Sequence, residues 1–342
     1  MDDRCRHFLE ETALEIRKDV VRMISLARSE QSALALSLVD VLVYLYWKVL
    51  RTFPTDPGNP LRDRFVLSDG LGGPALYAVL AAKGFFSRDE LWSFSRLGAV
   101  LQGMPFPGRT PGVDAPGGPP GQGLGIALGM VMALGKRRCD GAFSASGMSG
   151  EETASYVPAV FCCMNLEELR EGCVWDAARV AARDDALGGL RVVVNCPGWN
   201  GKTEPCRDEE MERLASRFRD LGWKAAVGDG HDFASVEEGF AALSTPERKD
   251  GTAVSSVRGA SCGVPGVLFL RTRYGKGVSA EENRDVASEG RPVFSRPRLD
   301  SALRELERRG GGSGTTPQEE SASEDASFRT DVFHSSGKEE FL

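Results

Sequence analysis

The sequence predicts an α/β fold, a doubly wound and mainly parallel sheet with helices on both faces. Two observations predict it. Short apolar runs alternate along the chain with longer stretches whose apolar residues recur every three or four positions, as in strands alternating with amphipathic helices. The expected strands are also apolar throughout, which is typical of parallel strands covered on both faces.

The elements follow from this periodicity in chain order. Two helices come first, and a connector with three prolines then leads to the first strand. The expected helices span residues 8–27, 37–50, 74–83, 88–96, 121–135, 168–183, 209–221, 236–243 and 298–309. The expected strands span residues 64–68, 157–163, 190–194, 223–227 and 267–271.

The helix expected at 121–135 is rich in glycine and alanine. Its glycines lack the G-x-G-x-x-G spacing of a phosphate loop, and no strong strand precedes it. We therefore predict that its small residues allow close packing against a neighbouring backbone.

Composition narrows the class of protein. The 342 residues include 49 acidic and 42 basic side chains, and a net charge of −7 argues against non-specific nucleic-acid binding. No run of about 18 apolar residues predicts a membrane span, and the charged N-terminal stretch is unlike a signal peptide. The eight cysteines form no C-x-x-C pair. We expect a cytoplasmic protein without a nucleic-acid or membrane partner.

Two regions differ in composition. Residues 1–309 are expected to form one domain with a substantial core. Residues 310–342 begin with three glycines and are rich in Ser, Thr and Glu, with few large apolar residues. This composition predicts a disordered tail.

Several segments, taken in order, resemble the thiamine-diphosphate-binding half of transketolase, and especially the N-terminal subunit of two-chain transketolases. They lie at residues 63–77, 97–103, 110–113, 121–124, 171–175, 228–232 and 271–278. The resemblance implies the thiamine-diphosphate-binding fold, with an active site shared with a pyrimidine-binding half. That half is not seen in this sequence, so a separate partner chain is expected.

The metal positions of the family are altered in this chain. The resemblance places the Gly-Asp-Gly metal motif on Asn165-Leu166-Glu167, and the later asparagine ligand on Pro197. Neither Leu166 nor Pro197 has a side-chain oxygen, whereas Mg²⁺ prefers oxygen ligands. The alternative is that Asn165, Glu167 or Asn195 turns toward the metal.

The imidazole positions of the family are altered too. The resemblance places three of its histidines on Gln31, Leu71 and Met104, and none of the three histidines in the chain falls at a matching position. A hydrogen bond to a charged group contributes ~1.5–3 kcal/mol, so losing two or three weakens binding by orders of magnitude. We therefore expect no cofactor, with thiamine diphosphate and Mg²⁺ as the alternative.

Other positions of the family are retained. They are Gly121, Gly123 and Leu124 at the glycine-rich helix, and the acidic residue Glu171, which the resemblance places near an interface between chains. No catalytic residue is assigned. His231 is predicted to be a loop residue, with Asp232 capping the following helix.

The resulting hypothesis is a pseudoenzyme that has an interaction or structural role. It would form a homodimer, pair with a separate pyrimidine-binding half, or do both. The alternative hypothesis is an active N-terminal half of a two-chain transketolase, which transfers a two-carbon ketol unit between sugar phosphates.

Overall fold

The computed structural model describes residues 1–139, 158–183, 187–198, 206–244, 263–282 and 296–310. Within these ranges the centre of the molecule is a parallel five-stranded sheet in the order β1-β2-β3-β5-β4. The strands are β1 (Arg64–Leu67), β2 (Val160–Asn165), β3 (Leu190–Cys196), β4 (Lys224–Asp229) and β5 (Gly266–Arg271). The predicted α/β class, with a parallel sheet, is confirmed.

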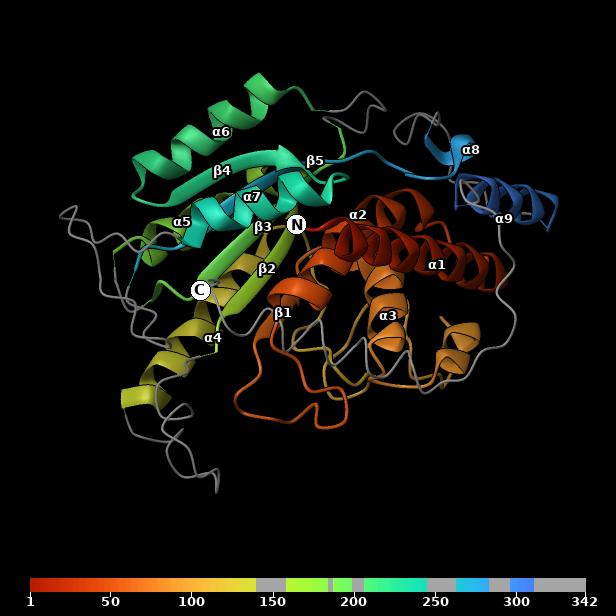
Figure 1. Ribbon diagram of the computed structural model, residues 1–342. Coiled ribbons are helices and arrows are strands. Elements are labelled where there is room, and N and C mark those ends of the chain that lie inside the picture. Colours follow the sequence, from red (N-terminus) through yellow and green to blue (C-terminus); the bar gives the residue numbers. More distant parts are fainter. Residues whose placement is uncertain (140–157, 184–186, 199–205, 245–262, 283–295, 311–342) are drawn as a thin grey trace.

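Helices cover both faces of the sheet (Figure 1). One hydrophobic cluster joins the sheet to α1 (Asp3–Ala27), α2 (Ser32–Tyr44), α3 (Gly73–Ala82), α7 (Phe233–Ser244) and α9 (Arg296–Gly310). The second joins it to α4 (Gln122–Cys139), α5 (Gly172–Ala181) and α6 (Asp208–Asp220). Successive strand residues divide between the clusters, because strand side chains alternate between the two faces.

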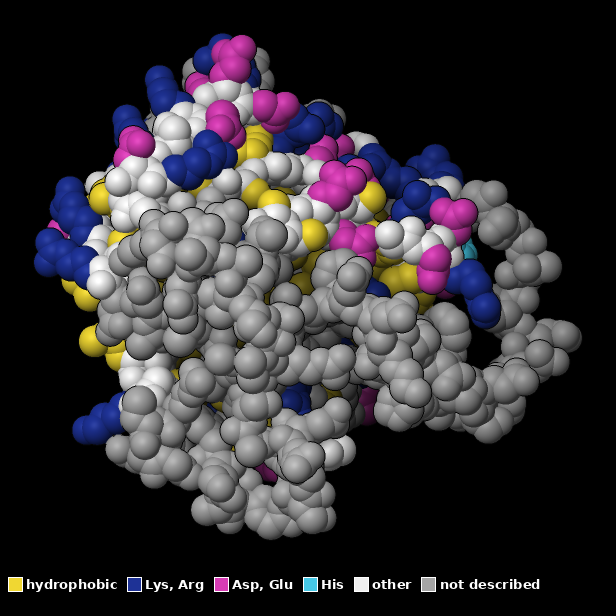
Figure 2. Space-filling view, turned by 60° about the vertical axis from the view of Figure 1, so that its left-hand side comes forward, with side chains coloured by type: hydrophobic (Ala, Val, Ile, Leu, Met, Phe, Trp, Pro, Cys, Tyr) yellow, Lys and Arg dark blue, Asp and Glu magenta, His cyan; other side chains and the backbone are white. Residues whose placement is uncertain are grey.

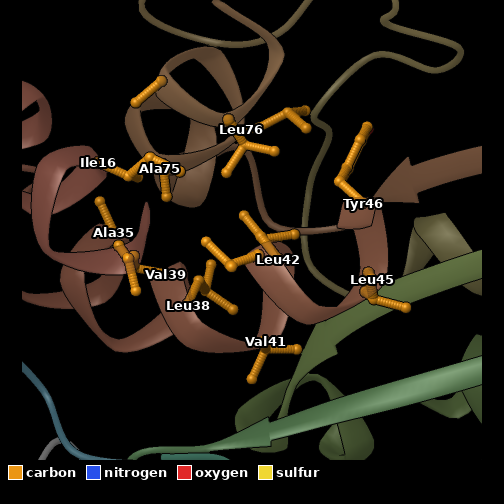
Figure 3. Packing of buried hydrophobic residues seen from close by; sticks show 14 of the residues in the cluster. Ile16, Ala35, Leu38, Val39, Val41, Leu42, Leu45, Tyr46, Ala75 and Leu76 are labelled. Carbon is orange, nitrogen blue, oxygen red and sulfur yellow. The ribbon is translucent and has the colours of Figure 1, made fainter. Parts of the chain in front are cut away.

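The first face is built around α2, whose side chains meet those of α1 and α3. Figure 3 shows Leu38 and Leu42 of α2 close to Ile16 of α1 and Leu76 of α3. All four side chains are buried. The helix is apolar nearly all round because it has neighbours on every side.

The segment Ser32–Val49 combines α2 with a π-helical turn, Leu45–Val49. It is long and apolar enough to cross a membrane by length and composition, which differs from the expectation that no such stretch exists. In the structure 78% of it is buried, and the core helix of a globular domain passes the same test. The helix begins five residues earlier than predicted, where the Ser32 hydroxyl donates to the buried Glu281.

Two other expectations on elements need correction, and one short helix was not expected. The helix expected at 168–183 is a 3-10 helix, Leu166–Arg170, followed by α5. The helix expected at 88–96 is a 3-10 helix, Arg88–Ser93, and the short α8 (Ser279–Glu282) was not predicted. The predicted tail at 310–342 lies outside the described residues except for its first glycine.

On the second face, α6 is amphipathic. Its buried Phe218 packs against Trp175, Trp223 and Phe269, with ring centroids 5.1, 5.4 and 5.9 Å away. Figure 2 shows basic and acidic side chains intermingled at the top of the molecule, over the outer side of α6. The mixed charges keep this face solvated.

Candidate site at the carboxyl edge of the sheet

The carboxyl ends of β1, β2 and β3 meet at one edge, where open α/β sheets bind their ligands. Asn165 and Asn195 are register partners at this edge. Asn195 donates to Asn165 Oδ1 over 3.1 Å, and Asn165 donates in turn to Asp69 Oδ2 over 2.6 Å. The Thr272 hydroxyl donates to Asn195 Oδ1 over 2.7 Å. Both amide groups are therefore engaged within the protein.

Glu168 is the buried carboxylate of this edge. It accepts hydrogen bonds from the Gly121 N–H over 2.7 Å, the Asn165 N–H over 2.8 Å and the Ser68 hydroxyl. Its burial raises the pKa of the carboxyl above the ordinary value, against the hydrogen bonds from Ser68 and the two amides. One side chain thus joins the ends of β1 and β2 to the start of α4.

Glu168 was not singled out from the sequence, although a signal was present. Asn165 and Glu168 have the spacing of a capping box, in which the residue three positions on bonds back to the cap. This cap was missed because a helix was expected to begin at residue 168. The capped element is instead the 3-10 helix Leu166–Arg170, which begins two residues earlier.

The close packing predicted for residues 121–135 is confirmed at Gly121 and Gly123 only, since nothing lies within 4 Å of a Cβ on Gly125, Gly129 or Gly135. Gly121 has φ +83°, and a Cβ there would lie 2.7 Å from Glu171 Cβ. A Cβ on Gly123 would lie 2.3 Å from Ser68 Cβ, and the Gly123 N–H donates to Ser68 Oγ over 3.1 Å. Leu124 is fully buried. These residues hold the edge together by packing.

The three residues that the resemblance places at histidine positions, Gln31, Leu71 and Met104, lie near one another. The Gln31 amide donates to the Gly103 carbonyl over 3.1 Å, next to Met104. A Cβ on Gly70 would lie 2.3 Å from Met104 Sδ, and Leu71 follows Gly70 in the same 3-10 turn. None of the three side chains ionises or relays a proton near neutral pH.

Gln31 Oε1 is buried and has no hydrogen-bond partner among the described residues. The neighbouring amide nitrogen is satisfied by Gly103, so this oxygen is the unfulfilled polar atom of the cluster. A buried acceptor without a donor costs free energy, and a partner or ligand N–H or O–H would satisfy it.

The predicted metal positions hold no side-chain ligand atoms. Leu166 is fully buried in the second hydrophobic cluster, and Pro197 is buried as well. Glu167 forms an ion pair with Arg170 over 3.1 Å. Within the ranges that the structure describes, no three His, Cys, Asp or Glu side chains are grouped to hold a metal ion.

The hollow at this edge is small. It is lined by Leu38, Leu67, Asp69, Cys163, Met164 and Asn165. Leu166 and Pro197, the residues at the predicted metal positions, supply no side-chain oxygen to a Mg²⁺ ion.

Glu171 adjoins the buried cluster, but its own side chain is exposed. It is exposed between the 3-10 helix and α5, and its N–H donates to the Glu168 carbonyl over 3.0 Å. Its carboxylate is therefore available to a group outside the chain. The predicted roles of these site residues remain predictions.

His231 was predicted to be a loop residue, and both nitrogens of its imidazole ring contact other residues of the protein. Its Nδ1 lies 2.7 Å from Asp40 Oδ2, and its Nε2 accepts from the Arg273 N–H over 2.9 Å. Arg17 bonds the same Asp40 oxygen over 2.5 Å. Asp232 Oδ1 accepts from the Ala234 N–H at the start of α7, as its predicted capping role requires.

The fold defines an α/β domain with a parallel five-stranded sheet covered by helices on both faces. Residues 10–282 match the family model described as transketolase, thiamine diphosphate binding domain. The chain therefore belongs to the transketolase family.

The curated relatives include both separate subunits and whole transketolases. A 6-deoxy-6-sulfo-D-fructose transketolase subunit of Clostridium sp. strain MSTE9 is 30% identical over 261 residues, which cover 73% of this chain and 79% of that protein. An apulose-4-phosphate transketolase subunit of Phocaeicola vulgatus is 28% identical, covering 86% of this chain and 92% of that protein. Human transketolase is 29% identical over 83% of this chain but only 40% of its own length.

Solved structures agree on the fold. Transketolase from Campylobacter jejuni superposes with a TM-score of 0.71 at 19% identity, over 98% of this chain and 48% of that one. Transketolase from Leishmania mexicana gives 0.70 at 20% identity, over 96% and 45%. At this identity the likeness establishes the fold alone.

The family match corrects one expectation. No cofactor was expected from the sequence, whereas the matched model is the thiamine diphosphate binding domain of transketolase. The expectation was wrong because it weighed a few substituted side chains and discounted the domain that carries them.

Proposed function

We propose that this chain is the N-terminal part of a split transketolase-like assembly, and that its role there is interaction or structure rather than the supply of catalytic groups. Proteins of matching length are named as transketolase subunits, whereas the chain spans 40% of whole human transketolase.

One observation supports the non-catalytic part of the proposal. Gln31, Leu71 and Met104, far apart in sequence, lie around a single place in the fold. Catalysis by proton transfer needs a group that ionises near the working pH, and these side chains supply none. The three differences from the histidines that the resemblance implies therefore concern a single site.

A ketol-transfer assay tests this proposal. The full chain is co-expressed with the chain of the same genome that carries the remaining transketolase domains, and is supplied with thiamine diphosphate and Mg²⁺. We expect a stable complex without ketol transfer above background. Transfer that is lost when Glu171→Ala is introduced, while the complex still forms, would contradict the non-catalytic role.

The active N-terminal half is the second candidate. It is favoured by the 30% identity to a named transketolase subunit over 79% of that protein. In this case the assembly would transfer a two-carbon ketol unit between sugar phosphates, and the exposed Glu171 would face the partner chain. The same assay separates the two candidates.

The assembly partners belong to the proposal too. A second copy and a separate pyrimidine-binding half are the two candidates, and α4 offers an outward face with exposed Gly125, Gly129 and Met132. Light scattering of the chain alone and with the companion chain distinguishes them. A cytoplasmic location is likewise proposed, and cell fractionation tests it.

A further inference from the structure

The chain that follows β5 lies against the amino-terminal end of α2. We call residues 272–282 the strap. The Gly275 N–H donates to the Ala33 carbonyl of α2 over 2.8 Å, and the Ser32 hydroxyl at the start of the same helix donates to Glu281 over 2.7 Å. These two contacts hold the middle and the far end of the strap on α2 through groups that do not titrate near neutral pH.

Two other contacts of the strap lead to the buried carboxylate of Asp40. The Arg273 N–H donates to His231 Nε2 over 2.9 Å, and His231 Nδ1 lies 2.7 Å from Asp40 Oδ2. Arg17 Nε donates to the Lys276 carbonyl over 3.2 Å, and its Nη2 donates to the same Asp40 oxygen over 2.5 Å. Asp40 therefore fixes the strap at two points, once through an imidazole and once through a guanidinium.

These contacts define the protonation state of the His231 ring. Burial would raise the pKa of the Asp40 carboxyl, but Arg17 and His231 hold it well below its usual range, so the carboxylate is ionised and can only accept. Nδ1 of the ring therefore carries the proton that it donates to Asp40. Nε2 keeps its lone pair and accepts from the Arg273 N–H, so the ring is neutral in this arrangement.

A second proton on the ring is incompatible with the contact to the strap. It would be placed on Nε2, where it would point at the Arg273 N–H, with one donor facing another. The hydrogen bond would be lost, and a positive charge would be added to a cluster that already holds Arg17. Histidine is the side chain whose charge ordinarily changes between about pH 5 and about pH 8.

The charged groups around the His231 ring have both signs. Asp229 Oδ1 accepts from the His231 N–H over 2.9 Å. The charged side chains on the surrounding elements are Arg17 of α1, Asp40 of α2, Asp229 of β4, Asp232 before α7, Arg271 of β5, and Arg273 and Glu282 of the strap. The carboxylates favour a protonated ring and the cations oppose it, so the hydrogen bond to the strap is the contact that protonation removes.

Thr272, the first residue of the strap, joins it to the carboxyl edge of the sheet. Its hydroxyl donates to Asn195 Oδ1 over 2.7 Å, and its N–H donates to the Cys196 carbonyl over 3.1 Å. Arg273 is the next residue, so a displacement of its backbone moves the peptide unit that carries Thr272. Release of Arg273 therefore reaches the contact with Asn195.

We propose that His231 is a pH-sensitive switch that acts on the strap. While the ring is neutral it binds the Arg273 N–H and holds the start of the strap to Asp40. When the ring is protonated it releases Arg273 and weakens the contact between Thr272 and Asn195 at the carboxyl edge. This inference is independent of the proposed function, because it concerns contacts within this chain alone.

Amide hydrogen exchange of the full chain, read residue by residue by NMR between about pH 8 and about pH 5, tests the switch. After correction for the intrinsic pH dependence of exchange, the Arg273 amide should lose protection by about tenfold or more as the ring protonates. The ring resonances of His231 should titrate with the same midpoint. The Gly275 amide, which is bonded to a carbonyl of α2, is the internal control and should keep its protection.

His231→Gln is the matched variant, because its amide group can donate to Asp40 and accept from Arg273 but does not ionise in this range. In this variant the Arg273 amide should keep its protection at every pH. His7→Gln removes an imidazole that is 63% exposed and should leave the behaviour of the wild type unchanged.

The outcomes are distinct. The switch is refuted if the Arg273 amide keeps its protection while the His231 ring protonates, or if the ring stays neutral down to about pH 5. It is also refuted if the Arg273 and Gly275 amides lose protection together, or if the loss persists in His231→Gln. The comparison of the two amides in the wild type gives the answer even if the variant does not fold.

Discussion

Glu168 is one carboxylate on which three segments depend. It accepts from Ser68 after β1, Asn165 after β2 and Gly121 before α4. Replacing it with alanine leaves those donors unsatisfied in a buried place, and each such group costs about 1–3 kcal/mol. The residue therefore matters for the geometry of the whole carboxyl edge.

The free energy of unfolding should depend on pH through the Glu168 carboxyl. Burial raises the pKa of Glu168 above its ordinary value of 4.5 in the folded state. Its contribution to stability is therefore greatest below 4.5 and falls as the pH rises through the raised pKa. In urea unfolding, the stability of the wild type relative to Glu168→Gln should decline over this range. A difference that grows with pH would contradict the assignment.

Asp40 should behave in the opposite way. Burial would raise the pKa of its carboxyl, but the Arg17 guanidinium and His231 outweigh burial and hold it well below the ordinary value of 3.8. The stabilisation is present above pH 3.8 and is lost as the pH falls below it.

Asp40→Asn should destabilise the fold by about 3–5 kcal/mol at neutral pH, because it leaves Arg17 buried without its carboxylate. Thermal unfolding checks this value. Asp3→Asn is the control, since the Asp3–Arg6 pair is exposed and such pairs contribute at most about 1 kcal/mol. Equal effects of the two changes would refute the role of Asp40.

At the scale of elements, α4 offers a matched pair of glycines. A Cβ on Gly123 would lie 2.3 Å from Ser68 Cβ, whereas nothing lies within 4 Å of a Cβ on Gly125. Gly123→Ala should therefore cost about 2 kcal/mol or more through overpacking. Gly125→Ala should stabilise the helix by up to about 1 kcal/mol. Urea midpoints of the two variants should shift in opposite directions.

Several elements could be predicted because their signals are local. The periodicity of α6 and α9 and the apolar runs of β3 and β5 gave bounds within two residues. The start of α2 could not be read in this way, because Ser32 is fixed by Glu281, which lies 249 residues away. The four-residue α8 is too short to show a helical period.

At the scale of the whole molecule, the sheet lies between two hydrophobic clusters and contributes side chains to both. Phe269 on β5 is fully buried in one cluster, and its neighbour Leu268 is fully buried in the other. Unfolding one face would expose the apolar side of the strands that the other face needs. We therefore expect the two faces to unfold together.

Fluorine NMR of 5-fluorotryptophan-labelled protein measures this coupling. Trp47 packs on the first cluster and Trp223 lies in the second, so each reports on one face. Both signals should convert to the unfolded form at the same urea concentration. Phe269→Ala should lower both midpoints together, at a cost of about 3–5 kcal/mol. Two separate midpoints would show that the faces unfold independently.

The candidate site was partly predictable. The resemblance identified Gln31, Leu71 and Met104 as related positions, and the structure places them together. It did not reveal Glu168 or the contact between Asp40 and His231. Those contacts join segments up to 191 residues apart, and no local pattern encodes such a pairing.

The sequence by itself determined the α/β class and the order of most elements, because periodicity is a local property. The tertiary structure decided which polar groups are buried together at the carboxyl edge. It also showed Leu97 and Phe106 exposed beside that edge. Burial and pairing depend on packing between distant segments, so they appear only when the chain has folded.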